Sequence, residues 1–224
     1  MIELHTFTFN TFSEQTYLID HGNGEATVVD PGMSNANERE TFANFCVDRS
    51  LKPVQLVLTH AHLDHVQGAG WVYEKWGLTP RLHPLDRTTY ETAPRSAMVY
   101  GVPMDLLPPL GPELKADEPI RCGEEELEIR FTPGHAPGHV VFVYTPGKWV
   151  IGGDVLFQRS IGRTDLPGSH APDLVRSIEQ QLYTLPDDFE VWPGHGPSTM
   201  IGEEKAANPF VNAAGTGMLQ AEMR

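Results

Sequence analysis

The sequence predicts an α/β protein built from two similar halves. Apolar runs of strand length alternate with longer segments of helical periodicity, in the order strands, helix, strand, helix, and then strands, helix, strand. Several strands end in Gly or Pro followed by His or Asp, which a buried core does not require. We find no sequence identity between the halves, so we expect the repeat to be architectural only.

Composition limits the classes of function. The 224 residues are enough for one large α/β domain or two small ones, and 40% apolar with 21% charged residues is typical of a globular protein. The 16 Lys and Arg against 30 Asp and Glu give a formal net charge of −14. Long-range repulsion would oppose encounter with nucleic acid or an anionic membrane surface, so we expect neither as a partner.

The cysteines and the N-terminus indicate the compartment. Cys46 and Cys122 are far apart and belong to no metal-binding spacing, which favours a reducing environment over a disulfide framework. The first residues lack a basic segment followed by an apolar one, and no apolar run reaches membrane-spanning length. We therefore expect a cytoplasmic protein.

The first half alternates strands and helices. Apolar alternation and turn signals predict strands at residues 4–9, 17–19, 26–29, 54–58 and 81–83. Helical periodicity predicts helices at about residues 35–49 and 66–76. The strand at 26–29 closes with Asp30, Pro31 and Gly32. Asp30 is either a group that orients a metal-bound histidine or an ordinary turn residue, and the local sequence leaves both open.

Residues 84–119 differ in character, because they are rich in Pro, Met and Tyr and have weak periodicity. Such an insertion either covers a pocket as a lid or packs against the neighbouring sheet. The second half then resumes the strand pattern. We predict its strands at residues 127–131, 140–144, 149–151 and 189–192, and its helix at 173–183.

The densest chemical signal follows the strand at 54–58. His60, His62, Asp64 and His65 place three imidazoles and one carboxylate within six residues, which is typical of a transition-metal site. In an extended chain alternate side chains point the same way, so His60 and His62 can converge on one ion. Where the chain turns toward a helix, Asp64 and His65 can address a second ion.

A buried strand followed by Gly or Pro also precedes His135, Asp154 and His195. Seven donors are too many for one tetrahedral ion, so we predict a binuclear site. The first ion is assigned to His60, His62 and His135, the second to Asp64, His65 and His195, and Asp154 bridges them. A hydroxide held between two ions ~3.5–4 Å apart is a nucleophile near neutral pH. His139, four residues after His135 at a strand start, is expected to support the site or the fold and not to bind metal.

Taken together, the HxHxDH cluster, His135, Asp154 and His195 resemble the metallo-β-lactamase superfamily over about residues 4–199. The resemblance implies a single domain over residues 1–224 with an αβ/βα four-layer sandwich, a metal pair where the two halves meet, and Asp30 behind a metal ligand. Within the superfamily the chain is similar to short, single-domain members of the glyoxalase II group. TPGHAPGH at 132–139, GRTD at 162–165 and NPF at 208–210 carry this likeness.

The resemblance implies hydrolysis of a small thioester such as a hydroxyacylglutathione, with two divalent ions, zinc first and iron or manganese as alternatives. Asp64 would orient the attacking water while binding metal. Because a thiolate leaves without strong acid assistance, the lack of an evident general acid agrees with this chemistry. Two-domain glyoxalase II enzymes add a C-terminal helical domain that binds glutathione, whereas only 29 residues (224 minus 195) follow His195 here. Arg163 could hold a substrate carboxylate, unless Asp165 pairs with it.

Two other interpretations remain. Persulfide dioxygenases of the same superfamily share the GRTD run and use a single iron held by two His and one Asp. Against this, the PGHGP run at 193–197 resembles the hydrolase form, and the second set of ligands is complete. A metal-binding protein without catalysis is the third interpretation. The acyl group, the thiol, the native metal and the oligomeric state stay open.

Overall fold

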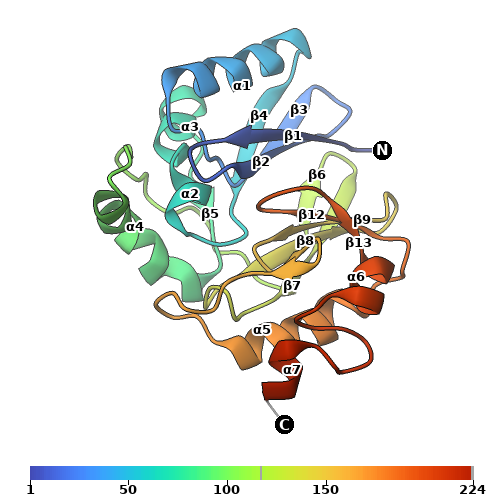
Figure 1. The fold of residues 1–224 in the computed structure, drawn as a ribbon. Coiled ribbons are helices and arrows are strands. Elements are labelled where there is room, and N and C mark those ends of the chain that lie inside the picture. Colours follow the sequence, from blue (N-terminus) through green and yellow to red (C-terminus); the bar gives the residue numbers. More distant parts are fainter. Residues whose placement is uncertain (117, 223–224) are drawn as a thin grey trace. The chain divides into compact units, whose positions relative to one another are not determined.

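The computed structural model describes residues 1–116 and 118–222 (Figure 1). The chain forms two compact units, the first made of residues 1–115 and 119–126 and the second mainly of the residues from 127 onward. Each unit is built on a β-sheet with flanking helices. The predicted α/β class with two sheets is therefore confirmed.

The sheet of the first unit has five strands in the order β1-β2-β3-β4-β5. These are β1 (Glu3–Phe9), β2 (Glu14–Asp20), β3 (Glu25–Val29), β4 (Lys52–Val57) and β5 (Pro80–Arg81). The strands β1, β2 and β3 pair antiparallel, whereas β4 runs parallel to both β3 and β5. Because parallel strands end at the same sheet edge, the residues after Val29 and Val57 emerge side by side.

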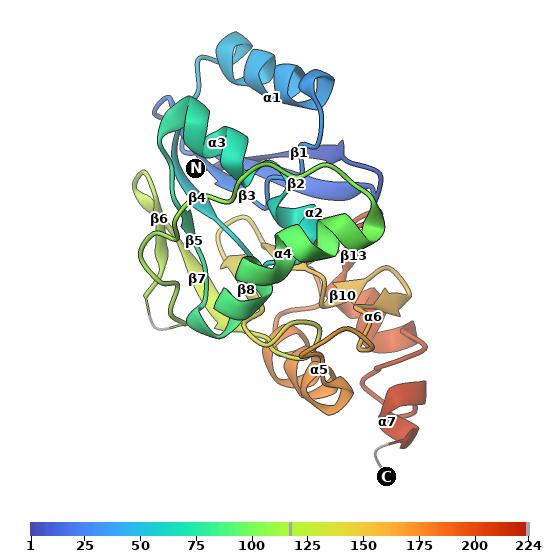
Figure 2. The ribbon, with the colours of Figure 1, turned by 90° about the vertical axis from the view of Figure 1, so that its left-hand side faces the viewer.

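Helices cover one face of this sheet. They are α1 (Ala36–Asp48), α2 (Leu63–Val66), α3 (Ala69–Trp76), the short 3₁₀ helix η1 (Pro84–Asp86) and α4 (Arg87–Tyr100). Phe42 of α1, Val72 of α3 and Ala93 of α4 are buried in one core with Leu18 and Leu56 of the sheet. Both views place α1 and α3 on the same side of the strands (Figures 1 and 2).

The single helix predicted at 66–76 is wrong in detail, because the chain forms two helices separated at Gln67 and Gly68. The Gly68 N–H donates to the carbonyl of Pro31 at 2.7 Å. A Cβ at Gly68 would lie 2.8 Å from the sulfur of Met33, so only glycine fits there. The close approach of the Pro31 loop thus separates α2 from α3.

The segment at 84–119, which lacked clear periodicity, contains the 14-residue helix α4. Its buried face consists of Tyr90, Ala93 and Ala97, and an internal Pro94 further weakens the helical signal. The Tyr90 hydroxyl donates to the Pro108 carbonyl at 2.8 Å and fastens the following loop. Residue 117 of this segment lies outside the described residues. A lid role for the segment stays a prediction.

The second sheet has the order β13-β12-β9-β8-β7-β6. The bounds are β6 (Ile120–Cys122), β7 (Glu125–Phe131), β8 (Val140–Tyr144), β9 (Trp149–Gly153), β12 (Glu190–Pro193) and β13 (Thr199–Met200), and the boundary between the units falls within β7. β9 and β12 pair in parallel, whereas β8 pairs antiparallel with β7 and β9. A separate hairpin joins β10 (Leu156–Phe157) to β11 (Ser160–Ile161).

The helices of the second unit pack on the same core as its sheet. They are α5 (Ala171–Ser177), the π-helix η2 (Ile178–Leu182), α6 (Ile201–Ala207) and α7 (Met218–Glu222). Leu174 and Ile178 pack with Val141 and Val191 of the strands. The helix predicted at 173–183 is therefore present, starting two residues earlier. Within the described ranges no helix is both long and apolar enough to cross a membrane.

Candidate metal centre

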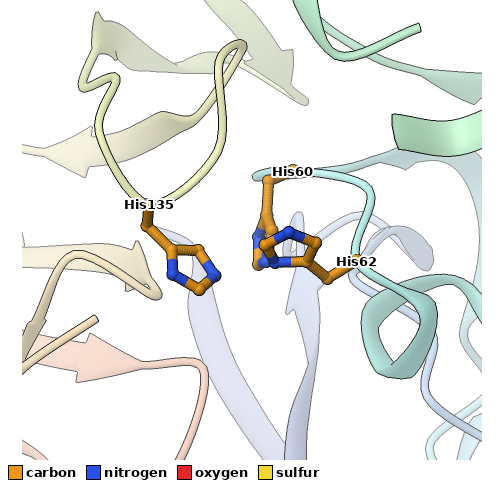
Figure 3. Close-up of side chains that lie close together, drawn as sticks. All are labelled: His60, His62 and His135. Atoms are coloured by element: carbon orange, nitrogen blue, oxygen red, sulfur yellow. The ribbon is translucent and has the colours of Figure 1, made fainter. Parts of the chain in front are cut away.

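The histidine cluster of the first unit lies just after β4. His60 and His62 precede α2, and their rings meet edge to face with centroids 4.8 Å apart (Figure 3). Asp64 and His65 belong to α2, and the His65 ring centroid lies 4.2 Å from that of His60. His60 and His65 are fully buried. The first unit therefore brings the rings of His62 and His65 against that of His60.

Asp30 lies directly behind this cluster. Its carboxylate accepts hydrogen bonds from the Thr59 N–H at 2.7 Å, the Thr59 hydroxyl at 2.6 Å and His65 Nδ1 at 3.1 Å. Asp30 reaches them because it ends β3, next to the end of the parallel strand β4. A carboxylate against the Nδ1 of a histidine is the arrangement that orients a metal ligand.

These bonds determine which ring nitrogen can bind a metal. His65 Nδ1 faces a carboxylate and therefore carries the proton, which leaves the lone pair on Nε2. The Thr59 hydroxyl donates its hydrogen to Asp30. Its oxygen therefore accepts the hydrogen bond that it shares with His60 Nδ1, at 3.0 Å. His60 is thus held in the same tautomer, with its lone pair on Nε2.

A second buried acid, Glu14 of β2, was not singled out from the sequence. Its Oε2 accepts from the Thr16 hydroxyl at 2.8 Å, and its Oε1 lies 3.9 Å from His65 Nδ1. Burial raises the pKa of Glu14 well above its ordinary value of 4.5. The sequence does not indicate that Glu14 is buried, because most residues of β2 are polar.

The raised pKa of Glu14 makes the stability of the metal-free protein depend on pH. Folding favours the protonated acid, so this stabilising contribution is present below pH 4.5 and is lost as the pH rises through the folded-state pKa. We expect Glu14→Gln to gain stability relative to the wild type at about pH 8 and to gain little at about pH 4. Denaturant unfolding of the metal-free proteins across this range measures the difference, and parallel pH profiles would contradict the assignment.

The second unit contains three of the predicted ligands, each after the end of a strand. His135 follows β7, whereas Asp154 and His195 follow the parallel strands β9 and β12, which end at one edge. One carboxylate oxygen of Asp154, Oδ2, lies 3.4 Å from His135 Nε2 and 3.6 Å from His195 Nε2. Asp154 is only 7% exposed. Its carboxylate therefore stands between two imidazoles, as a bridging ligand requires.

Backbone and histidine contacts fix this group. His135 Nδ1 donates to the carbonyl of Arg163 at 2.9 Å, which leaves the lone pair of His135 on Nε2. His139 Nε2 accepts the backbone N–H of Asp154 at 3.0 Å, and its Nδ1 lies 3.0 Å from the Thr132 hydroxyl. The lone pair of His139 is therefore engaged by the Asp154 N–H, and a supporting role for His139 stays a prediction.

Gly162 allows the close approach of these residues. A Cβ at this position would lie 1.9 Å from the Asp154 carbonyl oxygen and 3.1 Å from His135 Nδ1. We expect Gly162→Ala to displace both, with a stability loss of about 1–3 kcal/mol from overpacking and a fall in metal affinity of about tenfold or more. Competition with a chromophoric chelator measures the affinity. Ser160→Ala on the same hairpin is the control, and equal affinities for both variants would contradict the steric argument.

The Arg163 side chain pairs with Asp165, two residues further along the chain. Its Nε and Nη2 donate to the two carboxylate oxygens of Asp165 at 2.6 and 2.7 Å. These bonds lower the pKa of Asp165 to about 2. The pairing that the sequence left open is therefore formed, and both side chains are solvent-exposed.

Comparison with known proteins places the chain in a family. The metallo-beta-lactamase superfamily matches residues 10–195. The probable metallo-hydrolase YqgX of Bacillus subtilis is 36% identical over 84% of this chain and 88% of its own length. The hydroxyacylglutathione hydrolase GloC of Haemophilus influenzae is 35% identical over 90% of this chain and 94% of its own.

Solved structures of similar proteins have the same fold. TTHA1623, whose crystal structure is of a di-iron-bound form, is 36% identical with a TM-score of 0.83, over 92% of this chain and 100% of that one. ETHE1 from Myxococcus xanthus has a TM-score of 0.77 over 99% of this chain and 91% of that one, and at 24% identity it shows the fold alone. The family match covers most of the sequence, including every predicted ligand. The chain belongs to the metallo-beta-lactamase superfamily.

Proposed function

We propose that this protein is a binuclear metal-dependent hydrolase that cleaves small thioesters of the hydroxyacylglutathione type. The observation that carries the proposal is the tautomer of three histidines. In His60, His65 and His135 an oxygen acceptor engages Nδ1 and leaves the lone pair on Nε2. Such supporting bonds are typical of histidines that bind transition metals.

The donors of the two units act together in this proposal, as one hydrolase domain. One ion would be held by His60, His62 and His135 and the other by Asp64, His65 and His195, while Asp154 would contribute to both. When bound, two such ions lower the pKa of a shared water and polarise a carbonyl. Zinc suits this set of imidazole and carboxylate donors. The di-iron form of TTHA1623 makes iron the first alternative.

The residues of the chain have separate roles in the reaction. Asp64 is positioned by its backbone, because Asn10 Nδ2 donates to the Asp64 carbonyl at 3.0 Å. Its carboxylate is 15% exposed and would orient the attacking water while binding metal. His139 holds the backbone of Asp154 through the attack. The thiolate leaves without a general acid because its pKa is low.

The similarity to GloC, which is named as a hydroxyacylglutathione hydrolase, supports the choice of substrate. A small thioester also fits the charge of the chain, since a net −14 disfavours polyanionic partners. We propose that the protein acts on this substrate in the cytoplasm. The GRTD run at 162–165 keeps persulfide oxidation as the second candidate.

Parallel assays separate the candidates. The protein is stripped with chelator, reloaded with zinc or iron, and assayed for loss of thioester absorbance and for oxygen uptake with glutathione persulfide. We expect thioester cleavage with two equivalents of metal per chain. Oxygen uptake with one iron would instead support a dioxygenase, and inactivity in both assays would leave a metal-binding protein without catalysis.

Arg163 is proposed to bind a substrate carboxylate by exchanging it for that of Asp165. Charge-assisted bonds of this kind contribute about 1.5–3 kcal/mol, so we expect Arg163→Ala to raise KM about tenfold or more for carboxylate-bearing thioesters. Asp165→Asn should lower that KM, because it removes the negative charge that competes with the substrate carboxylate for the guanidinium. Uncharged thioesters should respond to neither variant. Steady-state kinetics on both substrate types checks this, and equal changes for both would exclude Arg163 from substrate binding.

A further inference from the structure

Glu204 of α6 is a buried carboxylate with four hydrogen-bond donors around it. Its Oε1 accepts from Arg159 Nη1 at 2.8 Å and from the Thr199 hydroxyl at 2.7 Å. Its Oε2 accepts from the Arg159 backbone N–H at 3.0 Å and from Asn208 Nδ2 at 2.8 Å. The Glu204 side chain is fully buried, whereas Arg159 is half exposed. A carboxylate so completely satisfied connects α6 and β13 to the β10–β11 hairpin.

Asn208, the first residue of the NPF run, makes a second connection. Its Nδ2 also donates to the Ser160 carbonyl at 3.0 Å. Its Oδ1 accepts from the backbone N–H groups of Phe210 and Val211 at 3.0 and 3.2 Å. The side chain therefore fixes the turn after α6 and the hairpin at the same time, which gives this run a structural purpose.

The hairpin held in this way adopts a conformation that is unfavourable by itself. Arg159 lies in the turn of the hairpin and has a φ of +56°, in the left-handed region. For a residue other than glycine this conformation is energetically unfavourable. The two bonds from Arg159 to Glu204 offset that cost and keep the turn in place.

The hairpin contacts two of the proposed metal ligands. Phe157 of β10 meets the His195 ring edge to face, with ring centroids 6.3 Å apart. At the other end, the chain leaving β11 places the Arg163 carbonyl 2.9 Å from His135 Nδ1. A shift of the hairpin would therefore disturb both imidazoles that flank Asp154.

We propose that Glu204 and Asn208 are positioning residues of the metal centre, which act through the β10–β11 hairpin on His135 and His195. The proposal rests on the proposed function only in taking these two histidines as metal ligands. Neither Glu204 nor Asn208 is among the proposed metal ligands or substrate-binding residues. Their effect is to fix the direction of two ligand rings, and so the geometry of the coordination sphere.

Two substitutions test this in the full-length protein. Glu204→Gln keeps the shape of the side chain but turns an amide N–H₂ toward donors that need an acceptor. Asn208→Asp keeps the acceptor for Phe210 and Val211 but loses the donations to the Ser160 carbonyl and to Glu204, and it places a second carboxylate against that of Glu204. The matched control is Lys205→Ala, because Lys205 fastens the same helix by donating to Leu185 O and Asp187 Oδ1 at 2.8 and 2.7 Å, away from the hairpin.

The readout is independent of catalysis. Each protein is loaded with Co²⁺, whose visible absorption reports the coordination geometry, and its Zn²⁺ affinity is measured by chelator competition. We expect both test variants to alter the Co²⁺ spectrum and to bind Zn²⁺ about tenfold more weakly. Lys205→Ala should keep the wild-type spectrum even if it lowers the melting temperature.

Two outcomes overturn the proposal. One is a wild-type Co²⁺ spectrum and Zn²⁺ affinity in Glu204→Gln and Asn208→Asp. The other is an equal loss in Lys205→Ala, which would mean that loosening α6 anywhere has the same effect. An altered spectrum in a protein that hydrolyses no thioester would support the positioning role while contradicting the proposed substrate.

Discussion

Replacing Asp154 with alanine is expected to abolish binding of both metal ions and to lower thioester hydrolysis by about a hundredfold or more. The reason is the position of its carboxylate, whose Oδ2 lies 3.4 Å from His135 Nε2 and 3.6 Å from His195 Nε2. No other carboxylate of the second unit is predicted to bind metal. Elemental analysis after desalting and a thioester assay measure the two effects.

The control for this variant is Asp188→Ala, which removes an exposed acid of the same unit that pairs with Lys148. It should keep both ions and full activity. The alanine at position 154 retains the backbone N–H that donates to His139, so the loop itself is expected to keep its conformation. Two ions per chain and undiminished activity in Asp154→Ala would exclude the bridging role.

The second large effect is expected for Asp30→Ala. This substitution leaves three buried donors without their acceptor, namely the N–H and hydroxyl of Thr59 and Nδ1 of His65. Each unsatisfied buried group costs about 1–3 kcal/mol, so we expect the free energy of unfolding to fall by about 3 kcal/mol or more. The His65 tautomer is no longer held, so metal affinity should fall as well.

Denaturant unfolding of the metal-free protein and chelator competition separate these two consequences. Thr59→Val is the graded comparison, because it removes only the hydroxyl between Asp30 and His60 and keeps the Thr59 N–H. It should lose less stability than Asp30→Ala. A midpoint of unfolding unchanged in Asp30→Ala would show that the carboxylate is not the anchor that its hydrogen bonds indicate.

The predicted ligands could be read from the local sequence. His60, His62, Asp64 and His65 are recognisable because donors of this kind so close together have no use in a core. What supports them was harder to find, because it depends on strand pairing. Asp30 meets Thr59 only through the parallel register of β3 and β4, which no local pattern encodes.

Other supporting residues gave no signal at all. Glu14 is buried on a strand whose residues are mostly polar. Glu204 lies in a short helix, where a glutamate is ordinarily exposed. Their environment is created by distant segments, which are the Pro31 loop for Glu14 and the β10–β11 hairpin for Glu204. Sequence patterns report which face of an element is apolar, and they do not report which polar group a folded neighbour will enclose.

The fold itself was predicted where periodicity is strong. The long strands and α1 are present at the expected places, whereas α4 was missed because its buried face is made of Ala and Tyr. The two-residue strands of the β10–β11 hairpin are too short for alternation to be detected. Yet that hairpin contacts two proposed ligands, so the least predictable element is among those that matter for the site.

Anomalous diffraction from crystals of the zinc-loaded protein tests most directly whether the proposed donors hold two ions. We expect two peaks ~3.5–4 Å apart. One should be bound by His60, His62 and His135 and the other by Asp64, His65 and His195, with Asp154 contacting both. A single peak, or peaks bound by residues of one unit alone, would contradict the claim.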